Sequence, residues 1–225
     1  MAGHSKWANI KHRKARQDAS RGKVWTKVIR EITVAAKAGP DPADNPRLRL
    51  ALDKANASNM PKDTIKRAIQ KGSGTGEMGA IEEITFEGYG PNGVAILVET
   101  MTDNRNITVA DVRHAFSKFG GNLGTDGSVA YLFNKIGVIN IASSYDEDVV
   151  MEIALDAGAD DMTSSEDGYE VITSSVNLSK VLEALTANNI ETIEAEVATR
   201  ADVLVDLDAE ASEKVLKIMN FMDDL

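Results

Sequence analysis

The spacing of apolar residues, which changes once along this chain of 225 residues, constrains its fold more than any other feature. Before the change, apolar residues recur every three or four positions, which predicts amphipathic helices over about 24–36, 46–55 and 61–69. The run Gly-Ser-Gly-Thr-Gly at residues 72–76 interrupts this pattern and is typical of a linker. We therefore predict a helical domain over residues 1–76.

After the linker, the pattern becomes that of strands. Strands are predicted over 81–86 and 94–98, and the Asn-Gly pair at Asn92-Gly93 favours a hairpin turn between them. A helix over 108–119 and a strand over 129–133 follow, separated by a Gly-rich stretch. This part of the chain therefore reads as strand, strand, helix, strand.

Residues 137–198 carry strand and helix patterns in the order βαββαβ, which is the order of a ferredoxin-like unit. The predicted strands cover 137–141, 161–164, 169–173 and 191–198, and the predicted helices cover 147–157 and 177–187. A last strand (203–207) and helix (209–222) lack a core of their own, so we expect them to complete the second domain. The predicted fold class is α+β: an N-terminal helical bundle, then an α+β domain (77–134 plus 203–225) with an inserted ferredoxin-like α+β domain (135–202).

Charge is distributed unevenly along the chain, although the net value is −10. Residues 1–80 contain 17 Lys and Arg against 7 Asp and Glu, a net of +10, and the remainder contains 8 basic and 28 acidic residues, a net of −20. Such asymmetry indicates a basic region that binds phosphate, joined to an acidic body that phosphate repels. We expect the chain to approach a nucleic acid with its N-terminal end.

The basic arm at the N-terminus is the predicted nucleic-acid contact. Lys and Arg pair with phosphate oxygens, and an indole can stack on an unpaired base. The alternatives left open are a solvated terminus that only aids solubility, and a tryptophan that packs on the bundle. Three further cations on the polar side of the first helix favour binding, so the predicted contact residues are Lys6, Trp7, Lys11, His12, Arg13, Lys14, Arg16, Lys23, Lys27 and Arg30.

A second contact surface is predicted at the Gly-rich loop over 120–127. The sequence GGNLGTDGS at residues 120–128 resembles a phosphate-cradling loop in composition only, because the spacing is not that of a Walker or dinucleotide motif. A helix-to-strand connection that needs positive φ explains the glycines equally well. The residues of this second contact are Asn104, Arg105, Asn106, Gly121, Asn122 and Gly124.

Other classes of function find little support in the sequence. The chain has no cysteine, its three histidines are scattered, and no Ser/His/Asp set can be assembled, so we expect no metal, no cofactor, no small-molecule substrate and no enzymatic activity. No stretch is apolar enough to span a membrane, and the basic start is not that of a signal peptide, so we expect a cytoplasmic protein. Zinc-finger spacing, an RRM signature and a clear helix-turn-helix are also missing.

Several segments resemble one known family. They are GHSKW at residues 3–7 and the arm to residue 16, GYGP at 88–91, DNRN at 103–106, and RHAFSKFGGNLGTDGSVAYLF at 113–133. On these segments the chain is identified as a member of the YebC family over essentially its whole length. The resemblance implies a helical domain followed by two α+β domains, the third inserted in the second. It also implies an acidic turn and a strand carrying Val-Tyr-x-Asn after the position of Leu225, where this chain stops.

The resemblance implies two different targets. Family members are described as transcriptional regulators that bind DNA, whereas mitochondrial relatives are translational activators of cytochrome oxidase subunit I and bacterial members relieve ribosomes stalled on proline runs. We therefore expect a regulator that binds structured RNA on the ribosome, with ribosomal proteins as further partners, and keep a DNA-binding transcriptional regulator as the alternative. A pure protein-interaction module is a third hypothesis.

Overall fold

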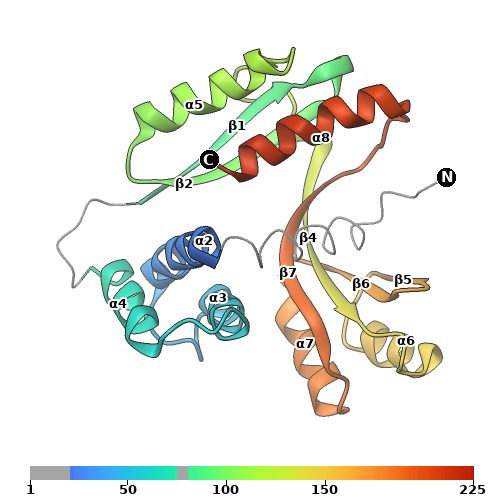
Figure 1. The fold of residues 1–225 in the computed structure, drawn as a ribbon. Helices are drawn as coiled ribbons and strands as arrows, with labels where there is room; N and C mark the ends of the chain where they lie inside the picture. Colours follow the sequence, from blue (N-terminus) through green and yellow to red (C-terminus); the bar gives the residue numbers. More distant parts are fainter. Residues whose placement is uncertain (1–20, 75–80) are drawn as a thin grey trace. The chain divides into compact units, whose positions relative to one another are not determined.

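The computed structural model describes residues 21–74 and 81–225 (Figure 1). The predicted basic arm, with the contact residues from Lys6 to Arg16, lies outside the described residues, as does the end of the Gly-rich linker. Among the described residues, Phe133–Asp202 form one compact unit, and residues 21–74, 81–132 and 203–225 belong to the other. Each unit is described by itself below.

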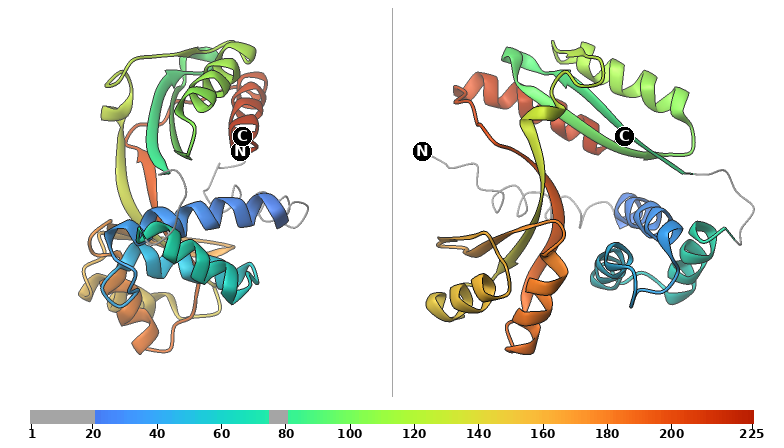
Figure 2. Two further views of the ribbon diagram at one scale, coloured as in Figure 1. Left: turned by 90° about the vertical axis from the view of Figure 1, so that its left-hand side faces the viewer. Right: turned by 180° about the vertical axis from the view of Figure 1, so that it is seen from behind.

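The N-terminal part forms the predicted helices, which we call the helical bundle. They are α2 (Arg21–Ala35), α3 (Pro46–Ala57) and α4 (Lys62–Gly72), with a short 3₁₀ helix, Ala36–Ala38, after α2. The three helices lie side by side (Figure 2). Their apolar residues form one buried cluster around Ile32, Leu48 and Ala68. The Asn45 side chain caps α3 by accepting from the Leu48 backbone N–H at 3.0 Å, and its amide donates to the Ala35 carbonyl at 2.7 Å. The three predicted helices are therefore confirmed.

The first sheet contains β1 (Glu82–Tyr89), β2 (Ala95–Thr102) and β3 (Asn122–Leu123) in the order β2-β1-β3. Both pairings are antiparallel. The turn between β1 and β2 places Asn92 at φ 61° and Gly93 at φ 71°, the left-handed conformations that an Asn-Gly hairpin turn adopts. The predicted hairpin is confirmed, and its strands are longer than expected.

Two helices cover this sheet, α5 (Arg105–Lys118) and α8 (Ala209–Asp223). Phe86 on β1 joins Phe116 on α5 and Ile218 on α8 in one buried cluster, so both helices pack on the same face (Figure 1). The rings of Phe119 and Phe221 meet edge to face, with centroids 5.5 Å apart. The last helix of the chain thus completes the core of this sheet.

The unit Phe133–Asp202 contains β4 (Phe133–Ile141), α6 (Glu147–Asp156), β5 (Asp161–Ser165), β6 (Gly168–Ser174), α7 (Leu178–Ala187) and β7 (Thr192–Ala201). Its sheet is antiparallel with the order β5-β6-β4-β7. Buried residues of β4 and β6 pack with apolar residues of the two helices in the core. This element order and strand order are those of a ferredoxin-like fold, so the predicted α+β class is confirmed.

Three details of the sequence prediction are wrong. Residues 129–133 were expected to form a strand, but Ala130–Leu132 form a 3₁₀ helix, and the strand β4 begins at Phe133. Residues 203–207 are not a strand: they pair with no other strand among the described residues, and Leu204 is 85% exposed. Helix α5 begins at Arg105 rather than at residue 108, because Asn104 caps it by accepting from the Ile107 N–H at 3.2 Å.

Candidate nucleic-acid interface

Helix α2 carries the predicted contact residues that the structure describes. Lys23 and Lys27 are exposed one turn apart, and Arg30 is half-buried. The Lys23 ammonium lies 3.1 Å from the Asp224 carboxylate, and the Lys27 ammonium contacts the Asp223 backbone carbonyl and lies 3.9 Å from its carboxylate. Exposed pairs of this kind stabilise a protein by about 0–1 kcal/mol, so a phosphate can compete for both lysines.

Helix α4 supplies further cations that the sequence analysis did not single out. Lys62, Lys66 and Arg67 are exposed, and Lys71 lies at the end of the same helix. The signal was present in the charge count: residues 21–74 contain 12 Lys and Arg against 5 Asp and Glu, a net of +7 without the arm. The helical bundle is therefore a cationic surface in its own right.

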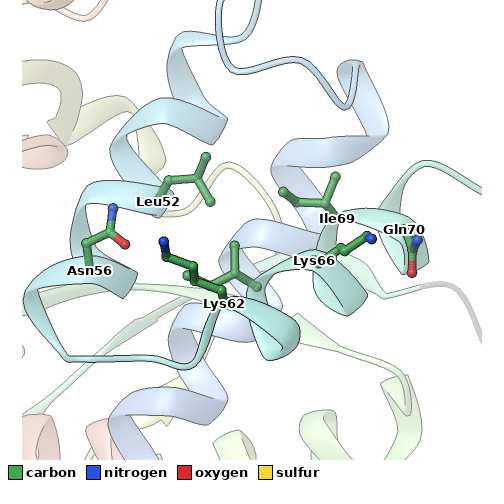
Figure 3. A pocket seen from close by; sticks show the side chains of 7 residues that line it. Leu52, Asn56, Lys62, Lys66, Ile69 and Gln70 are labelled. Atoms are coloured by element: carbon green, nitrogen blue, oxygen red, sulfur yellow. The ribbon is translucent and has the colours of Figure 1, made fainter.

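A shallow groove of about 390 Å³ runs between α3 and α4 (Figure 3). Half-buried apolar side chains form its floor, namely Leu52, Ile65 and Ile69. Exposed polar side chains surround them, namely Asn56, Lys62, Lys66 and Gln70. In Figure 3 the Lys62 ammonium reaches toward Asn56, and Lys66 lies on the side of Gln70. The groove thus combines an apolar surface with two cations and two amides.

The predicted second contact, around the N-terminus of α5 and the Gly-rich loop, has fewer donors available than the sequence suggests. The Asn104 side chain caps α5, and the exposed Arg105 guanidinium lies 3.7 Å from the Glu82 carboxylate, whereas Asn106 is exposed. In the loop, the Gly121 N–H donates to the Phe116 carbonyl at 2.9 Å. The Gly124 N–H donates to the Glu87 carbonyl at 2.7 Å, and Asn122 keeps an exposed side chain.

Glu87 occupies the place where a phosphate-binding loop would hold its anion. Its buried carboxylate accepts from the backbone N–H groups of Gly127 at 2.6 Å, Val129 at 2.8 Å and Ala130 at 2.6 Å. These hydrogen bonds, the one from Gly127 first, lower the pKa of Glu87 although burial alone would raise it. The Glu87 carboxylate therefore already accepts from Gly127 at the end of the loop and from Val129 and Ala130 after it, so the protein itself supplies the anion at these donors.

The lowered pKa of Glu87 predicts a loss of stability in acid. Because its pKa is lower in the folded than in the unfolded chain, the stabilisation is fully present above the unfolded value of about 4.3 and is lost as the pH falls through the folded value. We expect urea unfolding between neutral pH and about pH 3 to show that Glu87→Gln is less stable at neutral pH and loses less stability on acidification. Equal acid sensitivity in both proteins would contradict this assignment.

Other side chains also have pKa values that the surrounding protein shifts. Hydrogen bonding to Glu83 is the largest cause of the raised pKa of Arg47, whose guanidinium also contacts Glu31. Burial raises the pKa of Asp53, and the Lys217 ammonium lowers that of Glu213. Within residues 21–74 and 81–225, no three His, Cys, Asp or Glu side chains are arranged to hold a metal ion, and no helix is long and apolar enough to cross a membrane.

Comparison with known proteins gives a consistent result. One family model, described as the TACO1/YebC protein N-terminal domain, matches residues 5–75, and a second, described as the TACO1/YebC second and third domain, matches residues 81–225. A "Probable transcriptional regulatory protein" of Hahella chejuensis is 60% identical, covering 100% of this chain and 91% of the relative. A protein of the same name from Pseudomonas putida is 57% identical, covering 100% of this chain and 92% of the relative.

A solved structure extends the similarity to three dimensions. The crystal structure of a conserved hypothetical protein from Aquifex aeolicus has 42% sequence identity with this chain and a TM-score of 0.88. The alignment covers 98% of this chain and 92% of that one. The similarity therefore includes both compact units, and with them the helical bundle.

Proposed function

The chain belongs to the TACO1/YebC family, and from this premise we propose that it is a regulator of gene expression that acts by binding a nucleic acid, without catalysis. The observation that carries the proposal is the net charge of +7 on the helical bundle, in a chain whose net charge is −10. A cationic surface of this kind binds phosphate and releases counterions. The proposed site of action is the cytoplasm.

Structured RNA on the ribosome is the proposed target. The part of the chain after residue 80 has a net charge of −20, and such a body is repelled by the uniform phosphate surface of a duplex. A ribosome presents phosphate beside basic proteins. The basic N-terminal part of the chain can therefore face phosphate, while the acidic part after residue 80 faces basic proteins. The arm residues from Lys6 to Arg16 are proposed to make the first phosphate contacts, and Lys23 and Lys27 on α2 are proposed as further contacts.

A role without catalysis is supported by the way charged groups are used. The buried Glu87 carboxylate, for example, accepts from the backbone N–H groups of Gly127, Val129 and Ala130. An acid or base catalyst needs a titrating group that can reach a substrate. Arg47, Glu87 and Glu213 act instead within the protein's own hydrogen bonds and ion pairs.

Duplex DNA is the second candidate target. It is favoured by the names of the relatives from Hahella chejuensis and Pseudomonas putida, both of which describe transcriptional regulation. The same cationic bundle would then contact the DNA backbone, which supplies affinity but little sequence specificity. Specificity would need a further contribution, from DNA shape or from a partner protein.

The two targets are separated by one experiment. The purified protein is sedimented with ribosomes and, in parallel, titrated with a duplex DNA pool at equal phosphate concentration and physiological salt. We expect retention on ribosomes and weak, salt-sensitive DNA binding. Salt-resistant, selective DNA binding without ribosome retention would overturn the RNA target and favour the DNA candidate.

A variant of the arm provides the control for this experiment. Replacing Lys11, Arg13 and Lys14 with alanine removes three proposed phosphate contacts, each of which contributes about 0.7–0.9 to the slope of log affinity against log salt. The slope should therefore flatten by about 2–3, with a similar loss of affinity for every nucleic acid. An unchanged slope would show that the arm does not contact phosphate, and the cations of the helical bundle would then be the remaining proposed contacts.

A further inference from the structure

We infer that the groove between α3 and α4 binds an unpaired base of single-stranded nucleic acid. This inference rests on the proposed function and deepens it, because it names the form of nucleic acid that the helical bundle recognises. The groove is about 390 Å³, near the lower end of the range for small-molecule pockets, and a single heterocyclic base suits this size better than a helix does.

The floor of the groove suits the faces of a base. Leu52 on α3 and Ile65 and Ile69 on α4 are half-buried and leave apolar surface open to solvent. A base that leaves a stack exposes two apolar faces, and burying one of them against aliphatic side chains removes apolar area from water. A duplex keeps its bases stacked, so it cannot use this surface.

The rim of the groove suits the remaining parts of a nucleotide. Lys62 and Lys66 are exposed one turn apart on α4, about 6 Å along the helix axis, and can pair with successive phosphates of an extended strand. The Asn56 amide offers both donors and an acceptor, which matches the edge of a base. An apolar anchor of a protein partner would make no use of that amide, so the polar rim favours a base.

The sequence spacing shows why the groove has this composition. Along α4, Lys62 and Lys66 are four residues apart on the rim, and Ile65 and Ile69 repeat the interval on the floor. Along α3, Leu52 and Asn56 form the opposite wall at the same interval. Helix α4 therefore contributes an apolar row and a polar row, α3 contributes Leu52 and Asn56, and the groove forms because both helices pack on α2.

The test uses the full chain with three probes: a short single-stranded RNA, its duplex, and an abasic strand with the same number of phosphates. The variant Asn56→Leu removes the amide from an exposed helical position without changing the charge. We expect it to weaken binding of the base-bearing single strand about tenfold and to leave the duplex and abasic strand unchanged. Circular dichroism confirms that the variant is folded.

A pair of lysine variants separates the groove from general electrostatics. Lys66→Met removes a rim cation, and Lys71→Met removes the same charge from the same helix outside the groove. We expect Lys66→Met to weaken binding of the base-bearing strand more than Lys71→Met does, and the two variants to behave alike with the duplex. Equal losses from both variants on all three probes would overturn the groove while leaving the proposed function intact.

Three further outcomes would contradict the inference. Binding of none of the three probes by the wild-type chain would overturn the proposed function itself, and the groove inference with it. Tight binding of an acidic amphipathic helical peptide that the single strand cannot displace would assign the groove to a protein partner and overturn the inference. An abasic strand that binds as tightly as the intact strand would also overturn the inference, because it would show that the base makes no contribution to binding.

Discussion

Replacing Leu48 with alanine should lower the free energy of unfolding of the helical bundle by about 2–5 kcal/mol. Leu48 is fully buried in the cluster that joins α2, α3 and α4, beside Ile32 and Ala55. Truncation removes the transfer free energy of the side chain and leaves a cavity that three packed helices can only partly fill. The bundle carries the proposed binding surface, so its unfolding should abolish binding at temperatures where the wild-type chain still binds.

The measurement needs a probe that reports on the bundle alone. The Trp25 indole donates to the Ser58 carbonyl at 3.1 Å and packs against the bundle core, so its fluorescence follows this part of the chain. A Trp7→Phe background removes the other tryptophan. The matched control is Leu52→Ala on the same helix, which should cost less because Leu52 is only half-buried. An equal decrease in the free energy of unfolding for both variants would contradict the larger contribution expected of the fully buried Leu48.

Replacing Gly88 with alanine should destabilise the first sheet by about 3 kcal/mol, the upper part of the range for overpacking a core. A Cβ atom at Gly88 would lie 2.6 Å from the Asn122 carbonyl oxygen and 2.8 Å from the Phe116 ring. The carbonyl belongs to the neighbouring strand β3, and the ring is fully buried, so neither can move without disturbing the sheet. The loop held by the adjacent Glu87 should loosen as well.

The control for Gly88→Ala is Gly93→Ala in the hairpin turn. Gly93 has φ 71° and no atom within 4 Å of the position of a Cβ, so alanine there meets backbone strain of about 1–2 kcal/mol and no clash. Urea unfolding followed by far-ultraviolet circular dichroism compares the two variants. The close packing of β1 against β3 and α5 would be contradicted if Gly88→Ala were no less stable than Gly93→Ala.

Much of the candidate site could be predicted from local sequence, and part of it could not. The charge count located the basic surface in the N-terminal part, and the helical period predicted α2, α3 and α4. The cations of α4 were not predicted as contacts, because cations spread along a helix form a weaker sequence pattern than the contiguous basic run of the arm. The contact residues of the arm stay a prediction, since they lie outside the described residues.

The sequence by itself determined those features that depend on near neighbours: the helices with an apolar stripe, the Asn-Gly hairpin, and the βαββαβ order of the ferredoxin-like unit. These follow from the period of apolar residues and from turn chemistry, which act over a few positions.

Tertiary structure decided the features whose partners are distant in the chain. Residues 129–133 have strand-forming composition, but the Glu87 carboxylate, some forty positions earlier, binds the N–H groups of Val129 and Ala130 and ends any ladder there. Residues 203–207 have similar composition and pair with no strand among the described residues. The groove likewise exists only because α3 and α4 both pack on α2, an arrangement that no pattern within either helix specifies.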